Sequence, residues 1–141
     1  MDLELGPAGP RLDGRPVRDL EQLEATLGPP SRTVRVTRVI PGLEGGSVPD
    51  HVHVWDDAGL IAAPGLLVVA VGDNLLDEPV WPLNRFSGAV LVDGAPLDHA
   101  GMTLDPLREQ RRHADLGDAG LVVLTDWRGT PTKVVWRQAR G

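Results

Sequence analysis

The residue types that could do chemistry gather in one stretch of the chain, HVHVWDDAGL at 51–60. His51 and His53 stand two residues apart, so on a β-strand they face the same way, and Asp56 or Asp57 could be a third ligand to one metal ion. The simpler interpretation is two surface histidines on a strand that leads into a turn. We favour it because the other two histidines have no partner at a recognisable spacing. The sequence therefore predicts no metal site and no cofactor.

The adjacent carboxylates Asp56 and Asp57 could also act as a general acid and base. Neighbouring residues on a strand point to opposite faces, however, so the two would not share a substrate unless a turn realigned them. Turn formation explains at least one of them more simply. The chain has no cysteine, and none of its serines stands in a Gly-x-Ser-x-Gly motif. The sequence therefore predicts a protein that is not an enzyme.

A hairpin is predicted to position these side chains. Val52 and Val54 point to one side of a strand, and Trp55 points to the other side with the two histidines. Residues 56–59 (DDAG) are typical of a turn, and Leu60 begins a return strand. The tip of this hairpin therefore carries a Trp and two carboxylates, where a large ring is difficult to bury.

Charge is distributed unevenly along the chain, whose net charge is −6 at pH 7. Residues 41–80 contain seven acidic residues and no Lys or Arg, whereas 81–141 contain seven acidic and eight basic residues. An acidic protein is a poor candidate for binding nucleic acid. An exposed Trp among carboxylates is instead typical of a protein interface, and negative charge attracts a basic partner. The predicted partner-binding residues are Trp55, Asp56, Asp57, Asp73, Asp77 and Glu78.

The best-defined element elsewhere is a helix over 20–27. Asp19 stands at the capping position, three leucines recur at i, i+3 and i+7, and Gly28 follows the last turn. The uninterrupted apolar run at 66–71 predicts a central strand that is covered on both faces. Further strands are predicted at 33–37, 86–92, 121–124 and 133–137, and a short helix at Asp105. The predicted core residues are Leu20, Leu23, Leu27, Val34, Val36, Leu67, Val69, Val71, Val90, Val122 and Val135.

With 141 residues, 41% of them hydrophobic, the chain is expected to form a single compact domain. Residues 12–17 (LDGRPV) resemble 92–97 (VDGAPL), and 52–59 resemble 122–129. Either these short matches arose by chance, or residues 1–80 and 81–141 are an internal repeat. The predicted fold class is α+β, an antiparallel or mixed sheet with helices on one face, built as two β-α-β-β units if the repeat is real.

No apolar run approaches the 18 residues of a membrane span, and the N-terminus lacks the basic flank and apolar run of a signal peptide. The absence of cysteine leaves no disulfide framework. These features predict a cytoplasmic protein that binds neither membranes nor nucleic acid.

The hairpin W-D-D-x-G-L at 55–60, followed by F-x-G at 86–88 and D-G at 93–94, resembles a family of small bacterial proteins of unknown function. The resemblance spans about residues 1–97. Some members of that family are encoded beside polymorphic or contact-delivered toxins and are immunity-like. The helix at 20–27 with the strands after it also resembles the tandem units of the β-lactamase inhibitor protein fold. These resemblances imply a role and supply no catalytic residues.

Two functions remain open on the sequence alone. The first is an immunity or inhibitor protein that neutralises a basic toxin or effector domain through its acidic surface and exposed Trp. The alternative is an accessory module that binds a small ligand or a metal through His51, His53 and Asp56. Salt should slow the first kind of association, whereas pH should control the second.

Overall fold

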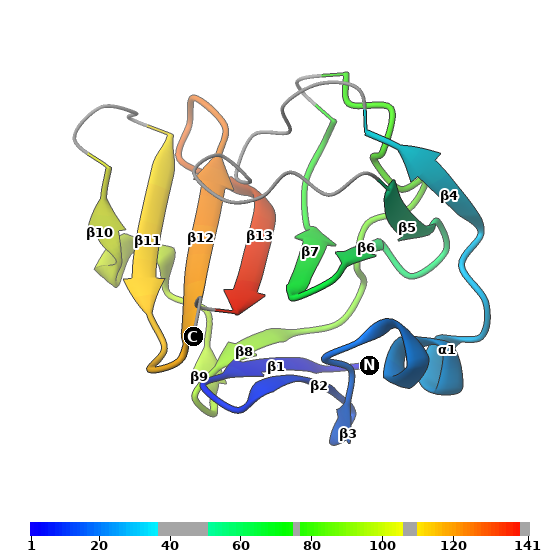
Figure 1. The fold of residues 1–141 in the computed structure, drawn as a ribbon. Coiled ribbons are helices and arrows are strands. Elements are labelled where there is room, and N and C mark those ends of the chain that lie inside the picture. The colour runs from blue at the N-terminus through cyan, green and yellow to red at the C-terminus, as the bar shows by residue number, and fades with distance from the viewer. Residues whose placement is uncertain (37–50, 75–76, 106–109, 139–141) are drawn as a thin grey trace.

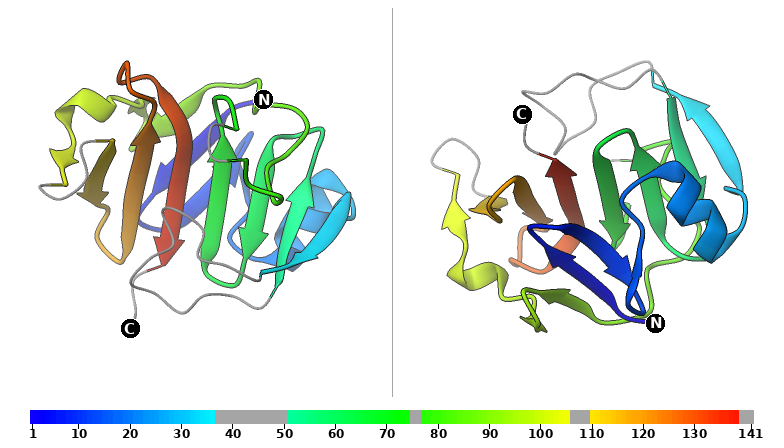
Figure 2. Two further views of the ribbon diagram at one scale, coloured as in Figure 1. Left: turned by 90° about the horizontal axis from the view of Figure 1, so that it is seen from above. Right: turned by 60° about the horizontal axis from the view of Figure 1, so that its bottom comes forward.

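The computed structural model describes residues 1–36, 51–74, 77–105 and 110–138. Two β-sheets lie one above the other, and the helix α1 (Leu20–Leu27) lies beside the smaller one (Figure 1; Figure 2, right). Of the described residues, 47% are in strands and 9% are helical. The α+β prediction with helices on one face is therefore wrong, because the segments that link the strands are mostly tight turns, too short to form covering helices.

The large sheet contains eight strands among the described residues, all antiparallel, in the order β10-β11-β12-β13-β7-β6-β5-β4. β7 pairs with β6 on one side and β13 on the other, which confirms that the apolar run at 66–71 forms an interior strand. The strands are β4 (Arg32–Arg35), β5 (His51–Trp55), β6 (Leu60–Ala63), β7 (Leu66–Ala70), β10 (Thr103–Leu104), β11 (Arg111–Asp115), β12 (Ala119–Thr125) and β13 (Pro131–Gln138).

The small sheet has the order β3-β2-β1-β8-β9, and β1 and β8 are its parallel pair. Asp13-Gly14 and Asp93-Gly94 close its two hairpins with nearly identical positive φ angles, 49° and 81° in the first and 49° and 80° in the second. Positive φ at both central residues defines the type I′ turn that an Asp-Gly pair favours. The strands are β1 (Leu3–Gly6), β2 (Gly9–Leu12), β3 (Arg15–Pro16), β8 (Val90–Val92) and β9 (Ala95–Pro96).

The order of elements after each Asp-Gly hairpin is similar in the two halves. The β2–β3 hairpin leads through α1 into the meander β4 to β7, and the β8–β9 hairpin leads through the short 3-10 helix η1 (His99–Gly101) into the meander β10 to β13. The meanders meet at the β7–β13 pair. Each half thus has a hairpin, a helix and four strands, not a β-α-β-β unit. The match between 52–59 and 122–129 joins β5 to β12, which stand at different places in their meanders, so the repeat itself stays a prediction.

The helix α1 has the predicted boundaries and caps. Asp19 Oδ1 accepts a hydrogen bond from the Gln22 amide at 2.8 Å, and Gly28 ends the helix at φ 82° with its amide bonded to the Glu24 carbonyl. Leu23 is fully buried, but Leu20 is 37% exposed, contrary to the prediction. A helix turns by about 100° per residue, so Leu20, three residues before Leu23, does not point in the same direction as Leu23. Its side chain therefore stays partly in solvent.

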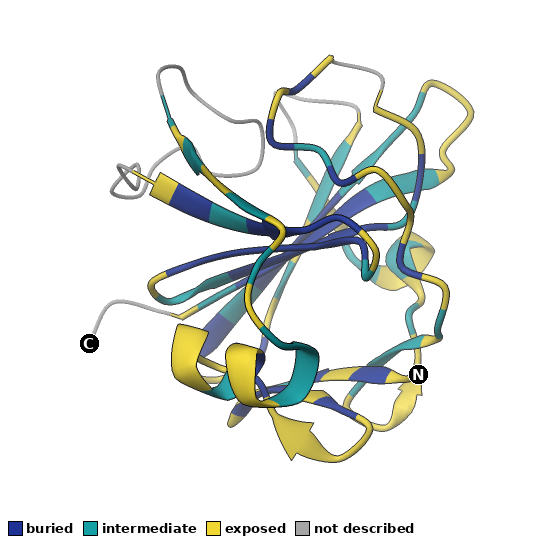
Figure 3. Ribbon diagram, turned by 90° about the vertical axis from the view of Figure 1, so that its right-hand side faces the viewer, coloured by how far each residue is buried: buried dark blue, intermediate teal, exposed yellow. Residues whose placement is uncertain are grey.

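The central strands of the large sheet, β5, β6, β7, β12 and β13, carry buried residues on both faces, whereas β4, β10 and β11 have none (Figure 3). One face packs against the small sheet and α1, and the other carries a second apolar cluster. Of the other predicted core residues, Leu67, Val69, Val122 and Val135 are buried, and Leu27, Val34, Val36, Val71 and Val90 are partly buried. The helix predicted to begin at Asp105 falls on 106–109, outside the described residues. In the described part of the chain, no helix has the length and apolarity needed to cross a membrane.

Candidate functional site

The β5–β6 hairpin forms where it was predicted, and a later segment of the chain crosses its tip. The Asn84 amide donates to the Asp56 carbonyl at 3.0 Å, and the Phe86 amide donates to the Ala70 carbonyl at 2.8 Å. Gly59 has φ 72°, and a Cβ there would lie 2.2 Å from the Phe86 nitrogen. This glycine therefore allows both the turn and the close crossing of the chain over it.

Trp55 lies in the core and is 4% exposed. Its indole Nε1 donates to the Gly28 carbonyl at 3.0 Å, just past the end of α1. Burying the ring with its N–H satisfied is the usual arrangement for a core Trp. The expectation that Trp55 is exposed at the hairpin tip is therefore wrong, because its side chain follows the strand face that turns toward the helix.

Asp56 is also buried, and its carboxylate holds the crossing segment in place. It accepts hydrogen bonds from Arg32 at 3.2 and 3.3 Å and from the Leu83 amide at 3.0 Å. The same guanidinium donates to the carbonyls of Pro79 and Trp81, at 2.7 and 2.8 Å. Asp56 therefore joins β4, the hairpin and residues 79–83, and it presents little carboxylate surface to a partner.

Glu78 forms a second buried ion pair with Lys133, the one lysine of the chain. The two charged groups are 2.7 Å apart, and both side chains are almost fully covered. The Lys133 ammonium also lies 5.4 Å from the centre of the Trp81 ring. Because Lys133 lies on β13, this pair fixes the segment after β7 to the large sheet.

The three other predicted carboxylates are exposed. Asp73 pairs with Arg85, Asp57 accepts a hydrogen bond from Asn84 at 3.4 Å, and Asp77 follows β7 in the chain with a positive φ of 50°. Residues from outside 41–80 supply cations for Asp56, Asp73 and Glu78. The local field is therefore weaker than the sequence indicates, since cations that are distant in the chain are close in space.

The predicted hairpin tip and the acidic segment after β7 do meet at one end of the large sheet. The starts of β6 and of β13 both lie beside the end of β7, through the pairs Leu60–Val69 and Lys133–Ala70. The turns before β6 and before β13 therefore project from the same end, together with the residues after β7. We call this surface the turn end and define it by Asp57, Asp73, Asp77, Leu83 and Trp127, which are all exposed.

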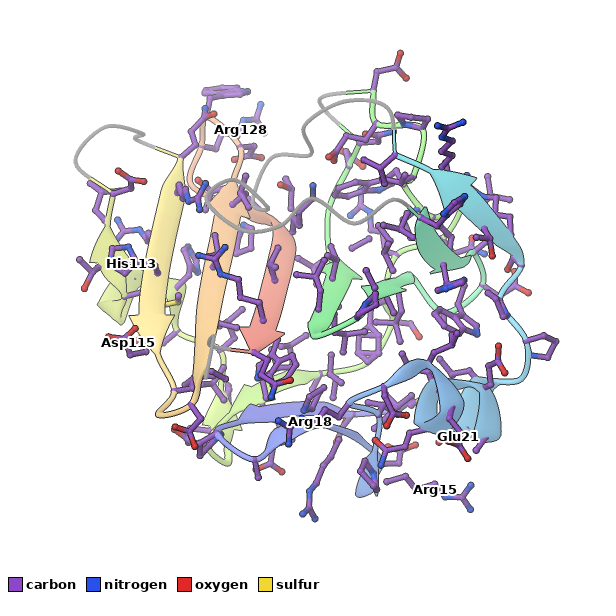
Figure 4. The ribbon with its side chains drawn as sticks, in the orientation of Figure 1. Arg15, Arg18, Glu21, His113, Asp115 and Arg128 are labelled. Carbon is purple, nitrogen blue, oxygen red and sulfur yellow. The ribbon has the colours of Figure 1, made fainter. Side chains whose placement is uncertain are left out.

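The β12–β13 turn contributes the most exposed Trp of the described residues, Trp127, with an exposed fraction of 76%. The carbon at the centre of the Arg128 guanidinium lies 4.6 Å from the indole centre. Figure 4 shows Arg128 at the opposite side of the molecule from Arg15 and Arg18, which lie beside the small sheet. The turn end is therefore a separate surface from the one near the small sheet.

Sequence reasoning placed Trp127 near a turn but did not include it in the site. The turn signal Asp126-Trp127-Arg128-Gly129 was present, and an indole at the centre of such a turn has no strand face to follow into the core. Leu83 was also missed, and nothing in the pattern around it distinguishes an exposed leucine from a buried one. Its exposure depends on the crossing segment, which distant side chains hold.

The alternative metal site finds little support in the geometry. His53 Nδ1 lies 2.9 Å from Thr33 Oγ1, while Asp56 is bonded to Arg32 and so is not available to the histidines. In the described residues, no group of three or more His, Cys, Asp or Glu side chains is arranged to hold a metal ion. Asp56 and Asp57 also differ in exposure, so they do not face one substrate as an acid–base pair.

Family models, curated protein sequences and solved structures were all compared with the chain, and none of them matches it.

Proposed function

We propose that the protein is a non-catalytic cytoplasmic binding protein of the inhibitor or immunity type, which neutralises a basic toxin or effector domain. The observation that carries this proposal is the turn end, where an exposed Trp and three exposed carboxylates share one surface. Aromatic side chains are enriched at protein interfaces, and complementary charge favours a basic partner. A chain without cysteine suits a reducing compartment.

Negative charge supports this partner class in two ways. It raises the rate at which a basic protein encounters the turn end. It also opposes the positive field of an active site that holds phosphate or nucleic acid, so a bound acidic protein can occupy such a site. The same charge disfavours nucleic acid and anionic membranes as partners.

The rigidity of the turn end favours binding over catalysis. Two ion pairs, Arg32–Asp56 and Lys133–Glu78, use the buried carboxylates of this region to hold its backbone. The carboxylates that remain exposed lie on the β5–β6 turn and in the segment after β7. A fixed surface without converging acid and base groups can recognise a folded partner with little ordering cost.

The test uses the protein encoded beside this chain in its genome, when that product carries a basic toxin-like domain, and a panel of other basic nuclease and toxin domains. We expect co-expression to restore growth to cells that the toxic domain arrests, and the two purified chains to form a stable complex. A protein that neither binds nor protects against any of these domains is not an inhibitor of this type.

A further inference from the structure

We propose that Leu83 and Trp127 are two apolar anchors through which the turn end docks onto its basic protein partner, an inference that rests on the proposed function. In the described part of the chain, the exposed large hydrophobic residues are Met1, Leu20, Leu83, Leu104 and Trp127. Leu83 and Trp127 are the most exposed of them, at 83% and 76%, and both lie at the turn end. Single exposed apolar residues are common, but two that share one surface with carboxylates need an explanation.

The backbone that carries Trp127 is held by several hydrogen bonds. Asp126 Oδ1 accepts from the amides of Arg128 and Thr130, each at 2.9 Å. The His99 ring also lies 2.9 Å from the Gly129 carbonyl and joins η1 to this turn. The indole therefore projects from a preorganised loop, so docking does not have to order the backbone first.

Leu83 is held equally firmly on the other side of the turn end. Its amide donates to the carboxylate of Asp56, and the next amide, of Asn84, donates to the Asp56 carbonyl. Asp56 is itself bonded to Arg32, which also binds the Trp81 carbonyl. A leucine whose backbone is fixed from both sides, and whose side chain stays in water, is available to fill a recess in a partner.

Leu83 is hydrogen-bonded to the β5–β6 turn and Trp127 lies on the β12–β13 turn, and these two turns are close enough to share one interface. The β5–β6 and β12–β13 turns are three strand spacings apart, which is about 14 Å at the usual distance between strands. A standard interface buries about 800 Å² on each partner, enough to cover both anchors. The polar pairs Asp57–Asn84 and Asp73–Arg85 lie at the same end of the sheet. Apolar anchors within a polar surround are the usual pattern of a binding hot spot.

Charge selects a basic protein as the occupant over a second copy of this chain. The exposed carboxylates Asp57, Asp73 and Asp77 outnumber the two arginines beside them, Arg85 and Arg128, so a symmetric contact would bring two net negative surfaces together, in a chain whose net charge is −6. Like charges that face each other across an interface disfavour association. A negatively charged membrane is disfavoured for the same reason. A protein with apolar recesses and a basic rim satisfies both the anchors and the carboxylates.

The test measures dissociation of the basic domain that the wild-type chain neutralises, in about 0.5 M salt, where the Debye length is only a few ångströms and steering is suppressed. We expect Trp127→Ser to raise the dissociation rate at least tenfold and Leu83→Ser at least threefold, with association rates changed less than twofold. Effects on a double variant should multiply, because the sites are distant. Leu20→Ser is the matched control, because Leu20 is an exposed leucine on α1, outside the turn end, and it should change neither rate.

The possible outcomes separate this inference from the function on which it rests. If the wild type binds and protects but both anchor variants dissociate at the wild-type rate, the anchors are wrong and the inhibitor function stands. If the wild type binds no basic domain, both proposals are wrong.

Two further results would identify a different occupant of the turn end. A wild type that sediments as a dimer and becomes a monomer on Trp127→Ser would identify a second copy of the chain, and binding to anionic phospholipid vesicles would identify a membrane. Either result overturns the inference. Thermal unfolding of each variant checks that the fold is retained.

Discussion

Asp56 and Asp57 are neighbours in the chain, yet only one of them offers a carboxylate to a partner. Asp56 faces Arg32 and the Leu83 amide inside the protein, whereas Asp57 lies on the surface beside Asn84. Residue type and position along the chain could predict that both stand at a turn. The sequence pattern could not predict that Asp56 is buried and Asp57 exposed. That difference depends on Arg32, 24 positions before Asp56, and on Leu83, 27 positions after it.

The buried Lys133–Glu78 pair should matter far more when it is broken than when it is replaced. We expect Lys133→Met to destabilise the protein by about 3–5 kcal/mol, because it leaves the Glu78 carboxylate buried without a counter-ion. Adding Glu78→Gln should recover much of that loss. Urea unfolding measures both effects. The control is Arg85→Met, which removes an exposed pair and should cost less than about 1 kcal/mol.

The two tryptophans near turns should have opposite roles. Trp55→Ala should lower the free energy of unfolding by about 3–5 kcal/mol, because it removes a large core side chain and its hydrogen bond to the Gly28 carbonyl. Trp127→Ala should change it by less than about 0.5 kcal/mol, as for other surface substitutions. Thermal and urea unfolding of the two variants provide the comparison. Equal losses would contradict the assignment of Trp55 to the core and of Trp127 to the surface.

Among the helices and strands, the sequence predicted well those features that depend on neighbouring residues, such as helix caps and tight turns. The helix α1 has its capping Asp19 and terminal Gly28 where sequence rules place them, and both Asp-Gly turns close hairpins. The strand predicted at 86–92 was too long, since only its last three residues join a sheet. Phe86 instead donates its amide to the Ala70 carbonyl as the chain crosses the β5–β6 hairpin. No periodicity marks such a crossing, so it could not be predicted.

Glycines at turns provide a test of this crossing. Gly14 has φ 81° and nothing within 4 Å of an added Cβ, so Gly14→Ala should cost only the left-handed backbone penalty, about 1 kcal/mol. Gly59 has a similar φ of 72°, but its Cβ would collide with the backbone of Arg85 and Phe86. Gly59→Ala should therefore destabilise the protein by clearly more than Gly14→Ala. Equal costs in urea unfolding would show that the segment does not lie over the hairpin.

The whole molecule combines two meanders that meet at the β7–β13 pair, with the Asp-Gly hairpins at opposite edges of the small sheet. The prediction of helices on one face failed at this scale. It assumed that each half supplies a covering helix, whereas the small sheet and α1 together cover one face of the large sheet. The parallel pairing of β1 with β8 joins residues far apart in the chain, which local patterns do not encode.

The electrostatic field is a property of the whole molecule. Charge variants can separate the effect of where the acidic residues lie from the effect of the net charge. Asp57→Lys combined with Asp77→Asn makes the turn end less negative, and asparagine suits the positive φ of 50° at Asp77. We expect this variant to associate with the neutralised basic domain several-fold more slowly at low salt, and at nearly the wild-type rate at about 0.5 M salt. Dissociation should change less, because these groups are exposed.

The matched control is Glu24→Lys combined with Glu21→Gln, which alters the net charge by the same amount on α1, outside the turn end. If the acidic residues of the turn end steer the partner, the control variant should associate faster than the turn-end variant at low salt. The reason is that the charges nearest the binding surface dominate the final approach of a partner. If both variants slow association equally, the net charge of −6 acts as a whole and the arrangement of acids at the turn end has no special role. Stopped-flow mixing at several salt concentrations distinguishes the two cases.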